Sequence, residues 1–157
     1  MLFILFQLGR DHYALDAAQV AEVLPLVRVK KIPRAPAGVA GVFTYRGAPV
    51  PVLDLSALAL GRPAHARLST RLLLVHYPDP AGTKRLLGLI AEKATETLRR
   101  APGDFVASGV RSDGAPYLGP VVSDARGLIQ WIEVDKLLPA AVRDVLFTQI
   151  GEGADVR

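Results

Sequence analysis

The chain has 157 residues, half of them hydrophobic and 22% charged, with 14 glycines, 12 prolines, no cysteine and a formal net charge of +4. This is the composition of a globular protein, and a chain of this length buries roughly 70% of the surface that its unfolded form exposes, so it needs no disulfide or metal for stability. The lack of cysteine excludes thiol catalysis, thiolate zinc sites and iron–sulfur clusters.

The sequence also excludes a signal peptide and a membrane-spanning helix. Residues 2–6 are apolar, but no basic stretch precedes them and no small-residue cleavage site follows, so they are not a signal peptide. The longest uncharged run, residues 35–45, has 11 residues, which is shorter than the roughly 18 that a membrane-spanning helix needs. We therefore expect a soluble, cytoplasmic protein.

The predicted elements of the first half are short strands. Residues 2–8 form a strand that turns at Gly9 into a partner strand at 13–15. Residues 45–53 form two strands around Arg46-Gly47. Because the prolines at 49 and 51 cannot donate hydrogen bonds, this pair is expected at a sheet edge or beside a bulge.

The second half is also predicted to form mainly short strands. Residues 71–77 and 86–91 form a hairpin, residues 101–116 form the longest loop, and residues 128–134 form a strand whose side chains alternate between two faces.

Helices are predicted to be few. Asp16, Asp54 and Asp135 each precede a short helical turn. Pro139 suits the first turn of a final helix whose apolar stripe is formed by Val142, Val145 and Leu146. Residues 151–157 are expected to be a frayed tail after a single domain that spans residues 1–150.

An internal repeat organises the chain. Residues 13–24 align with 87–98 at an offset of 74, and the matches are Leu15/Leu89, Ala17/Ala91, Glu22/Glu96 and Leu24/Leu98. Arg46-Gly47 aligns with Arg126-Gly127 at an offset of 80, and each pair precedes an apolar strand. The repeat predicts two related barrel units of about five strands each, at roughly residues 2–53 and 71–134 and interleaved at their ends.

The positive charge belongs to the first half of the chain. Residues 1–78 carry nine Lys/Arg and four Asp/Glu, a net of +5, whereas residues 79–157 carry ten and eleven, a net of −1. The densest part contains Arg28, Lys30, Lys31 and Arg34. Such a patch could attract an acidic partner or a nucleic acid, and it could equally be a solvated strand end that prevents aggregation.

No catalytic constellation is present. Phosphate-binding loops, dinucleotide-binding glycines and hydrolase or metalloprotease motifs are all missing from the sequence. The acidic residues Glu22, Asp54, Glu92 and Glu96 are explained by helix capping and by the repeat. We therefore expect a protein that is not an enzyme, with no cofactor and no metal site. The remaining signal is for recognition, because Phe43, Tyr45 and Arg46 are of the types that dominate interfaces.

A larger pattern resembles a known family. Its pieces occur in the order and spacing of the CheW family of chemotaxis coupling proteins: Phe6-x-Leu8-Gly9, Tyr13-x-Leu15-Asp16, Val20-x-Glu22-Val23, Ile32-Pro33, Gly41-Val42, Arg46-Gly47, Pro51-Val52-x-Asp54-Leu55 and Leu86-x-Gly88-Leu89. The likeness covers about residues 2–147.

The resemblance implies a mainly β fold of two intertwined five-stranded SH3-like barrels with short helices and a C-terminal helix. It also implies a non-catalytic adaptor that couples the cytoplasmic tip of a methyl-accepting chemoreceptor to the regulatory domain of a CheA-type histidine kinase. In this family the first unit mainly binds the kinase and the second closes larger signalling rings, so membrane association is only indirect, through the receptor.

Four residues match the family's receptor-contacting positions. The receptor-contacting arginine falls on Arg46, with Val20 and Glu22 on the neighbouring element and Gly41 in the strand that leads to it. Glu22 also has a structural explanation: because Glu96 matches it in the repeat, the two glutamates could each form a cap or a pair within their own barrel. Within the family, the chain is most similar to the first coupling protein of a Wsp-type surface-sensing pathway, whose output is a diguanylate cyclase.

Two alternatives remain at this stage. A basic twin-barrel protein that binds nucleic acid would lose affinity steeply with salt. A regulatory fragment of a larger kinase is disfavoured, because the chain begins at Met1 and ends shortly after the expected tail.

Overall fold

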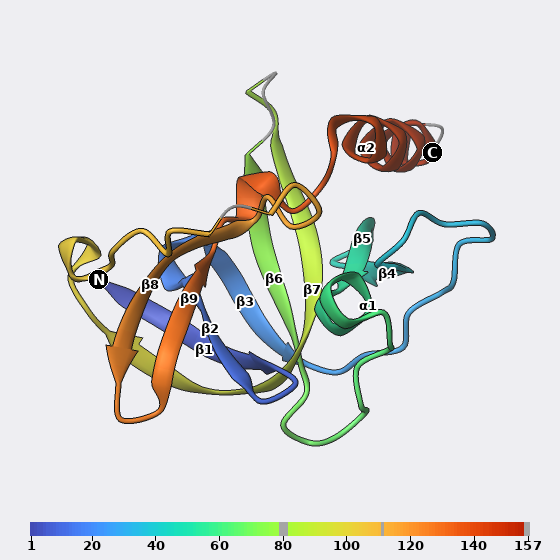
Figure 1. Cartoon of the computed structure of the whole chain (residues 1–157). Helices are drawn as coiled ribbons and strands as arrows, with labels where there is room; N and C mark the ends of the chain where they lie inside the picture. Colours follow the sequence, from blue (N-terminus) through green and yellow to red (C-terminus); the bar gives the residue numbers. More distant parts are fainter. Residues whose placement is uncertain (79–81, 111, 156–157) are drawn as a thin grey trace.

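The computed structural model describes residues 1–78, 82–110 and 112–155. In this part of the chain nine strands form one continuous sheet that curls into two barrels (Figure 1). The strands are β1 (Leu2–Leu8), β2 (Asp11–Asp16), β3 (Val20–Pro25), β4 (Val39–Tyr45), β5 (Ala48–Asp54), β6 (Arg71–Pro78), β7 (Lys84–Arg99), β8 (Leu118–Asp124) and β9 (Gly127–Ile132). The helices are α1 (Leu55–Leu60) and α2 (Ala140–Asp155), with short 3-10 turns at Ala17–Gln19, Pro102–Asp104 and Val134–Lys136.

One barrel contains strands from both ends of the chain, and we call it the terminal barrel. It consists of β1, β2, β8, β9 and residues 92–99 of β7. β1 pairs with β2 and β7, β2 pairs in parallel with β9, and β9 pairs with β8. A bridge between Val106 and Val121 continues the ladder beyond β8.

The other barrel, the central barrel, consists of β3, β4, β5, β6 and residues 84–91 of β7. Its closing bridge joins Lys30 to Val42 through two backbone hydrogen bonds of 2.8 Å. Pro49 and Pro51 lie in the part of β5 that pairs with β4 alone, because the pairing of β5 with β7 begins only at Val52. The strand is therefore an edge where the prolines lie, as the sequence predicts.

Strands of the two repeats are exchanged, and the exchange goes further than the interleaving at the ends that the sequence predicts. β1 and β2 of the first repeat share a barrel with β8, β9 and the second half of β7. β6 and the first half of β7 share the other barrel with β3, β4 and β5. In Figure 1, β1, β2, β8 and β9 lie on the left, β4 and β5 on the right, and β6 and β7 between them. β7 serves both barrels as a single 16-residue strand with a bend at Lys93, whose φ is 51°.

Three apolar clusters hold this arrangement together. The interior of the terminal barrel contains 7 buried residues and that of the central barrel contains 6, whereas the cluster between the barrels contains 19. β6 illustrates the reason: Leu72 and Leu74 point into the central barrel, while Leu73 and Val75 point into the shared cluster. Apolar runs without alternation are what strands covered on both faces require.

The capping predictions are largely confirmed. The Asp16 carboxylate accepts from Ala18 N at 2.9 Å, and Asp54 Oδ1 accepts from the N–H groups of Ser56 and Ala57 at 3.0 and 3.2 Å. The turn predicted to follow Asp135 begins at Val134 instead and contains Asp135.

The final helix, α2, follows Pro139 as predicted but continues past Gly151 to Asp155, where the sequence predicts a frayed tail. Residues 156 and 157 lie outside the described residues. Of the predicted stripe, Leu146 is buried and Val142 half-buried, but Val145 is 48% exposed. Phe147 contacts the sheet in place of Val145, because its ring packs on Tyr77 of β6 with the ring centroids 5.5 Å apart.

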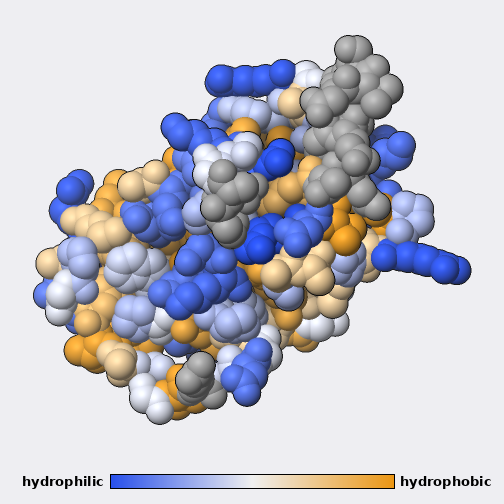
Figure 2. Space-filling model, turned by 90° about the horizontal axis from the view of Figure 1, so that it is seen from above, coloured by the Kyte–Doolittle hydropathy of each residue, from blue (hydrophilic) through white to orange (hydrophobic). Residues whose placement is uncertain are grey.

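The face seen from above is mixed, with hydrophilic residues across its middle and apolar residues toward both ends (Figure 2). Among the helices of the described residues, none is long and apolar enough to span a bilayer.

Candidate functional site

The turn between β4 and β5 presents Arg46 to solvent. Arg46 and Gly47 have φ angles of 49° and 81°, and positive φ at both central positions is the signature of a type I′ hairpin turn. Such turns favour Asn-Gly, because most side chains are strained at positive φ. An arginine in this place is therefore held against its backbone preference, and its side chain is 80% exposed.

Two neighbours define the surroundings of this side chain, and the three residues together form what we call the Arg46 cluster. The Tyr45 hydroxyl donates to Glu22 Oε1 on β3 at 2.7 Å. Arg46 Nη2 lies 3.8 Å from the same oxygen, and the Arg46 guanidinium carbon is 5.2 Å from the centre of the Tyr45 ring. The hydrogen bond to Glu22 is the main reason that the pKa of the Tyr45 hydroxyl is raised.

The terminal barrel contains a counterpart of this cluster. Arg126, in the turn between β8 and β9, lies 3.0 Å from Glu96 of β7 and also pairs with Asp124. These carboxylates raise the pKa of Arg126, with the Glu96 contact as the largest cause. The sequence repeat thus corresponds to a repeated contact between a turn arginine and a strand glutamate.

The two arginines differ in how firmly they are held. Arg126 has two carboxylate partners, and its side chain is 34% exposed. At the position that corresponds to Asp124, the central barrel has Thr44, so Glu22 at 3.8 Å is the one carboxylate within ion-pair distance of Arg46 among the described residues. Arg46 therefore retains a planar set of donors that can pair with a carboxylate of another molecule.

Of the four predicted site residues, the structure brings Arg46 and Glu22 together. Gly41 lies near the opposite end of β4, where it pairs with Val52. A β-carbon at Gly41 would lie 2.0 Å from the Lys30 carbonyl oxygen, and its φ is 148°, so this glycine permits the bridge that closes the central barrel. Val20, at the start of β3, packs against the shared cluster between the barrels.

Sequence reasoning missed the role of Glu92. This carboxylate of β7 accepts from the His65 N–H at 2.8 Å, from Arg62 Nη1 at 3.1 Å and from Ser56 Oγ at 3.3 Å. Burial alone would raise the pKa of Glu92, but the hydrogen bond from His65 and the Arg62 guanidinium lower it below its ordinary value. Glu92 thus fastens the loop that follows α1 to β7. No sequence signal marks this position, because at the repeat offset of 74 Glu92 aligns with Ala18.

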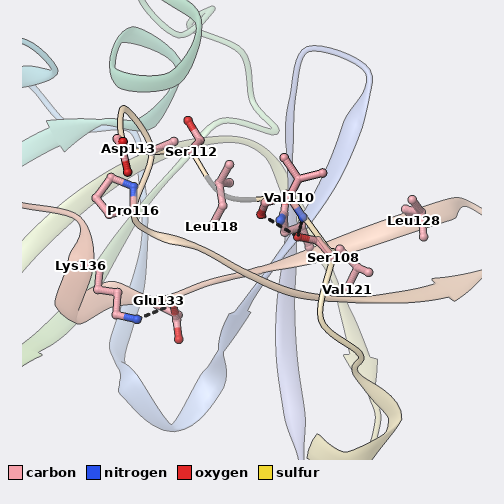
Figure 3. Close-up of a pocket in the computed structure, with 12 residues that line it drawn as sticks. Ser108, Val110, Ser112, Asp113, Pro116, Leu118, Val121, Leu128, Glu133 and Lys136 are labelled. Carbon is pink, nitrogen blue, oxygen red and sulfur yellow. Dashed lines mark hydrogen bonds and ion pairs between the residues drawn. The ribbon is translucent and has the colours of Figure 1, made fainter.

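A groove of about 730 Å³ lies on the terminal barrel between β8, β9 and the loop before them. In Figure 3, Glu133 and Lys136 face each other at one end, joined at 3.2 Å, and Leu128 lies at the other end. Val110 and Leu128 of its lining are 80% and 64% exposed. The Ser108 hydroxyl donates to the Val110 carbonyl, so it is engaged within its own loop.

Nothing in the described residues assembles into a reactive centre. They contain no group of three or more His, Asp or Glu side chains that could hold a metal ion. The pairs around Arg46, Glu92 and Arg126 each join a carboxylate to an arginine. The Ser56 hydroxyl that donates to Glu92 is fully buried, so it is not open to a substrate. Two barrels that share one strand and expose separate surfaces define a binding module.

The comparisons with known proteins agree with this class. Residues 2–142 match the CheW-like domain, and the chain belongs to this family. It is 38% identical to a chemotaxis protein CheW of Treponema pallidum over 143 residues, which cover 85% of this chain and 79% of that protein. It is 27% identical to a chemotaxis protein CheW of Rhizobium meliloti over 143 residues, which cover 90% and 89% of the two chains.

The fold has also been solved before. The crystal structure of the scaffolding protein TtCheW from Thermoanaerobacter tengcongensis superposes with a TM-score of 0.78 at 22% identity and covers 92% of both chains. The predicted mainly β fold is therefore confirmed. CheW proteins are non-catalytic scaffolds, so the chain is a coupling adaptor of chemotaxis and not an enzyme.

Proposed function

We propose that this chain acts in the cytoplasm as the link between the tip of a methyl-accepting chemoreceptor and the regulatory domain of a CheA-type histidine kinase. Arg46 is the receptor-contacting residue in this proposal. The observation that supports it is the contrast within the repeat: Arg126 pairs with two carboxylates, whereas Arg46 is 80% exposed and pairs with a single carboxylate of the described residues, at 3.8 Å.

The other members of the proposed site have different roles. Glu22 orients Arg46 and Tyr45 from β3. Gly41 and Val20 act indirectly, through closure of the central barrel and through the packing of β3. A coupling protein needs two surfaces that can be occupied together, and the groove on the terminal barrel offers one that is separate from Arg46.

The test is a pull-down from native cytoplasm with the wild-type chain and with Arg46→Ala, followed by mass spectrometry. The wild-type chain should recover a kinase and a chemoreceptor, and Arg46→Ala should lose the receptor but keep the kinase. Because an exposed ion pair contributes only about 0–1 kcal/mol, the variant should remain folded. Arg126→Ala removes the repeat counterpart and serves as the control that keeps both partners.

Two outcomes would contradict this proposal. Recovery of RNA or DNA that salt removes would indicate a nucleic-acid-binding protein instead. An Arg46→Ala chain that is unfolded would make Arg46 a structural residue.

The proposal extends to the pathway. We infer that the adaptor belongs to a Wsp-type surface-sensing system whose output is a diguanylate cyclase, on the basis of the overall sequence likeness. Identification of a response regulator with a diguanylate cyclase domain among the proteins recovered with the kinase would support this pathway, and a flagellar-motor regulator in its place would contradict it.

A further inference from the structure

The surface beside the Arg46 turn is strongly basic. Between Glu22 and Asp54 the chain contains no acidic residue, but it contains Arg28, Lys30, Lys31, Arg34 and Arg46. Neither flanking carboxylate neutralises the first four of these, because Glu22 contacts Tyr45 and Arg46, while Asp54 is 7% exposed and accepts three backbone N–H groups at the start of α1 and at Ala64.

These cations have no acidic partner among the described residues. In the described part of the chain, the side chains of Arg28, Lys30, Lys31 and Arg34 have no acidic group within ion-pair distance, and all four residues are exposed. Four neighbouring positive charges without counter-charges repel one another in the free protein. An acidic ligand would relieve this repulsion.

Three of these residues, Arg28, Lys30 and Lys31, line a groove of about 740 Å³ on the central barrel. Val27 and Val29 pack inward against the core of this barrel, so Arg28 and Lys30, which alternate with them, point outward. The groove lining also contains the apolar residues Val42 and Pro49, both of them half-exposed. Val42 is one of the two residues of the closing bridge. The groove thus combines basic residues with an apolar lining.

We propose that this groove binds an acidic, extended segment of a partner protein, with its carboxylates on Arg28, Lys30 and Lys31 and its apolar side chains on the groove lining. A single-stranded nucleic acid fits less well, because it needs exposed aromatic faces for stacking. Phe43 is only 7% exposed, and the Arg46 guanidinium already lies over the Tyr45 ring. The inference rests on these charges and does not require the receptor role of Arg46.

The test uses the full chain and a fluorescein-labelled peptide of alternating Glu and Val, with binding followed by fluorescence anisotropy at low salt. Lys30→Glu with Lys31→Glu should weaken binding by about tenfold or more, because it reverses two of the charges around the groove. These side chains are exposed and the closing bridge uses only the Lys30 backbone, so the fold is retained. Arg99→Glu with Arg100→Glu changes the net charge equally on the terminal barrel and should leave binding within about twofold.

Carbodiimide treatment provides a second measurement, because it joins a carboxylate to an amine that it contacts directly. The crosslinks should map to Lys30 or Lys31. If the two double variants weakened peptide binding equally, binding would depend only on the net charge of the protein, and the proposal would be wrong. Tighter binding of an oligothymidylate than of the peptide would assign the groove to nucleic acid. If neither probe bound, the proposal would be wrong and the basic residues would be a solvated strand end.

Discussion

Arg46 and Gly41 illustrate two ways in which a single residue can matter to a binding protein. Arg46 adopts a left-handed backbone conformation that an arginine does not favour, while its side chain remains exposed. Strain of this kind persists where the surrounding structure enforces it, and it is concentrated at functional positions. Gly41 is buried and has no side chain to offer a partner, so its importance lies in what its small size permits.

Gly41→Ala should therefore destabilise the fold before it affects any partner. The new methyl group would meet the Lys30 carbonyl oxygen at 2.0 Å, and the bridge that closes the central barrel would have to open. The combined strain and lost pairing should cost about 3 kcal/mol, which corresponds to a Tm lower by about 6–12 °C for a chain of this size.

Gly9→Ala provides the control for Gly41→Ala. Gly9 also has a positive φ, 63°, but a β-carbon there meets nothing within 4 Å. It should cost only the conformational strain, about 1–2 kcal/mol. If Gly41→Ala kept the wild-type Tm and still lost the receptor, Gly41 would have to contact the partner directly.

At the scale of elements, Glu92 joins three segments that the sequence leaves unconnected. It ties α1, the loop at residues 62–65 and β7 to one another beside the bend at Lys93. Since the Glu92 side chain is only 12% exposed, the hydrogen bonds to it are worth more than those of a surface pair.

Glu92→Gln should lower the free energy of unfolding by about 2 kcal/mol at pH 7. A carboxyl whose pKa is lower in the folded than in the unfolded chain stabilises the fold above its unfolded pKa of about 4.3, and this contribution is lost as the pH falls through the folded pKa. The pKa of Glu92 is lowered, so the difference between wild type and variant should shrink below about pH 4. Urea unfolding between pH 7 and pH 3 measures it.

The control for this prediction is Glu133→Gln. Glu133 pairs with Lys136 at 3.2 Å, where the two side chains are 33% and 52% exposed, and such a pair contributes less than about 1 kcal/mol. A constant difference between wild type and Glu92→Gln across the whole pH range would mean that Glu92 acts through packing alone.

At the scale of the whole molecule, the sequence predicts contacts that depend on short spacings. The capping aspartates and the Arg46-Gly47 turn are visible because each depends on residues two or three positions apart. The match of Glu22 with Glu96 predicts a cap or a pair in each barrel, and the structure shows an ion pair with a turn arginine in both. The pairing of β2 with β9 and of β5 with β7 joins residues far apart in the chain, and parallel pairing of this kind leaves no local pattern.

For the same reason, the sequence could not show which predicted site residues lie beside Arg46 and which act only through packing or barrel closure. Val20 and Glu22 lie two positions apart on β3, but a bulge between them shifts the pairing with β6. Val20 therefore packs on the shared cluster, while Glu22 reaches Arg46. The close approach of the Lys30 carbonyl to Gly41 depends on the closure of the barrel, which no spacing within the sequence records.

The exchanged strands and the shared cluster predict that the two barrels unfold together. Neither barrel contains a complete repeat, and their separation would expose the 19 buried residues between them. Leu74→Ala tests this coupling, because Leu74 is fully buried inside the central barrel and its truncation should cost about 3 kcal/mol. Trp131 is the chain's one tryptophan and packs against the core of the terminal barrel, so its fluorescence reports on the barrel that is not mutated.

In thermal unfolding of Leu74→Ala, the Trp131 fluorescence and the far-UV circular dichroism should move to the same lower midpoint, because a cooperative unit loses both barrels at once. Leu5→Ala makes the reciprocal change, since Leu5 is 2% exposed in the core of the terminal barrel, and it should also give one transition with both probes. A Trp131 midpoint that stayed at the wild-type value in Leu74→Ala, beside a two-step dichroism curve, would show that each barrel is stable alone. Coupling through the shared cluster would then be excluded as a route by which binding to one barrel influences the other.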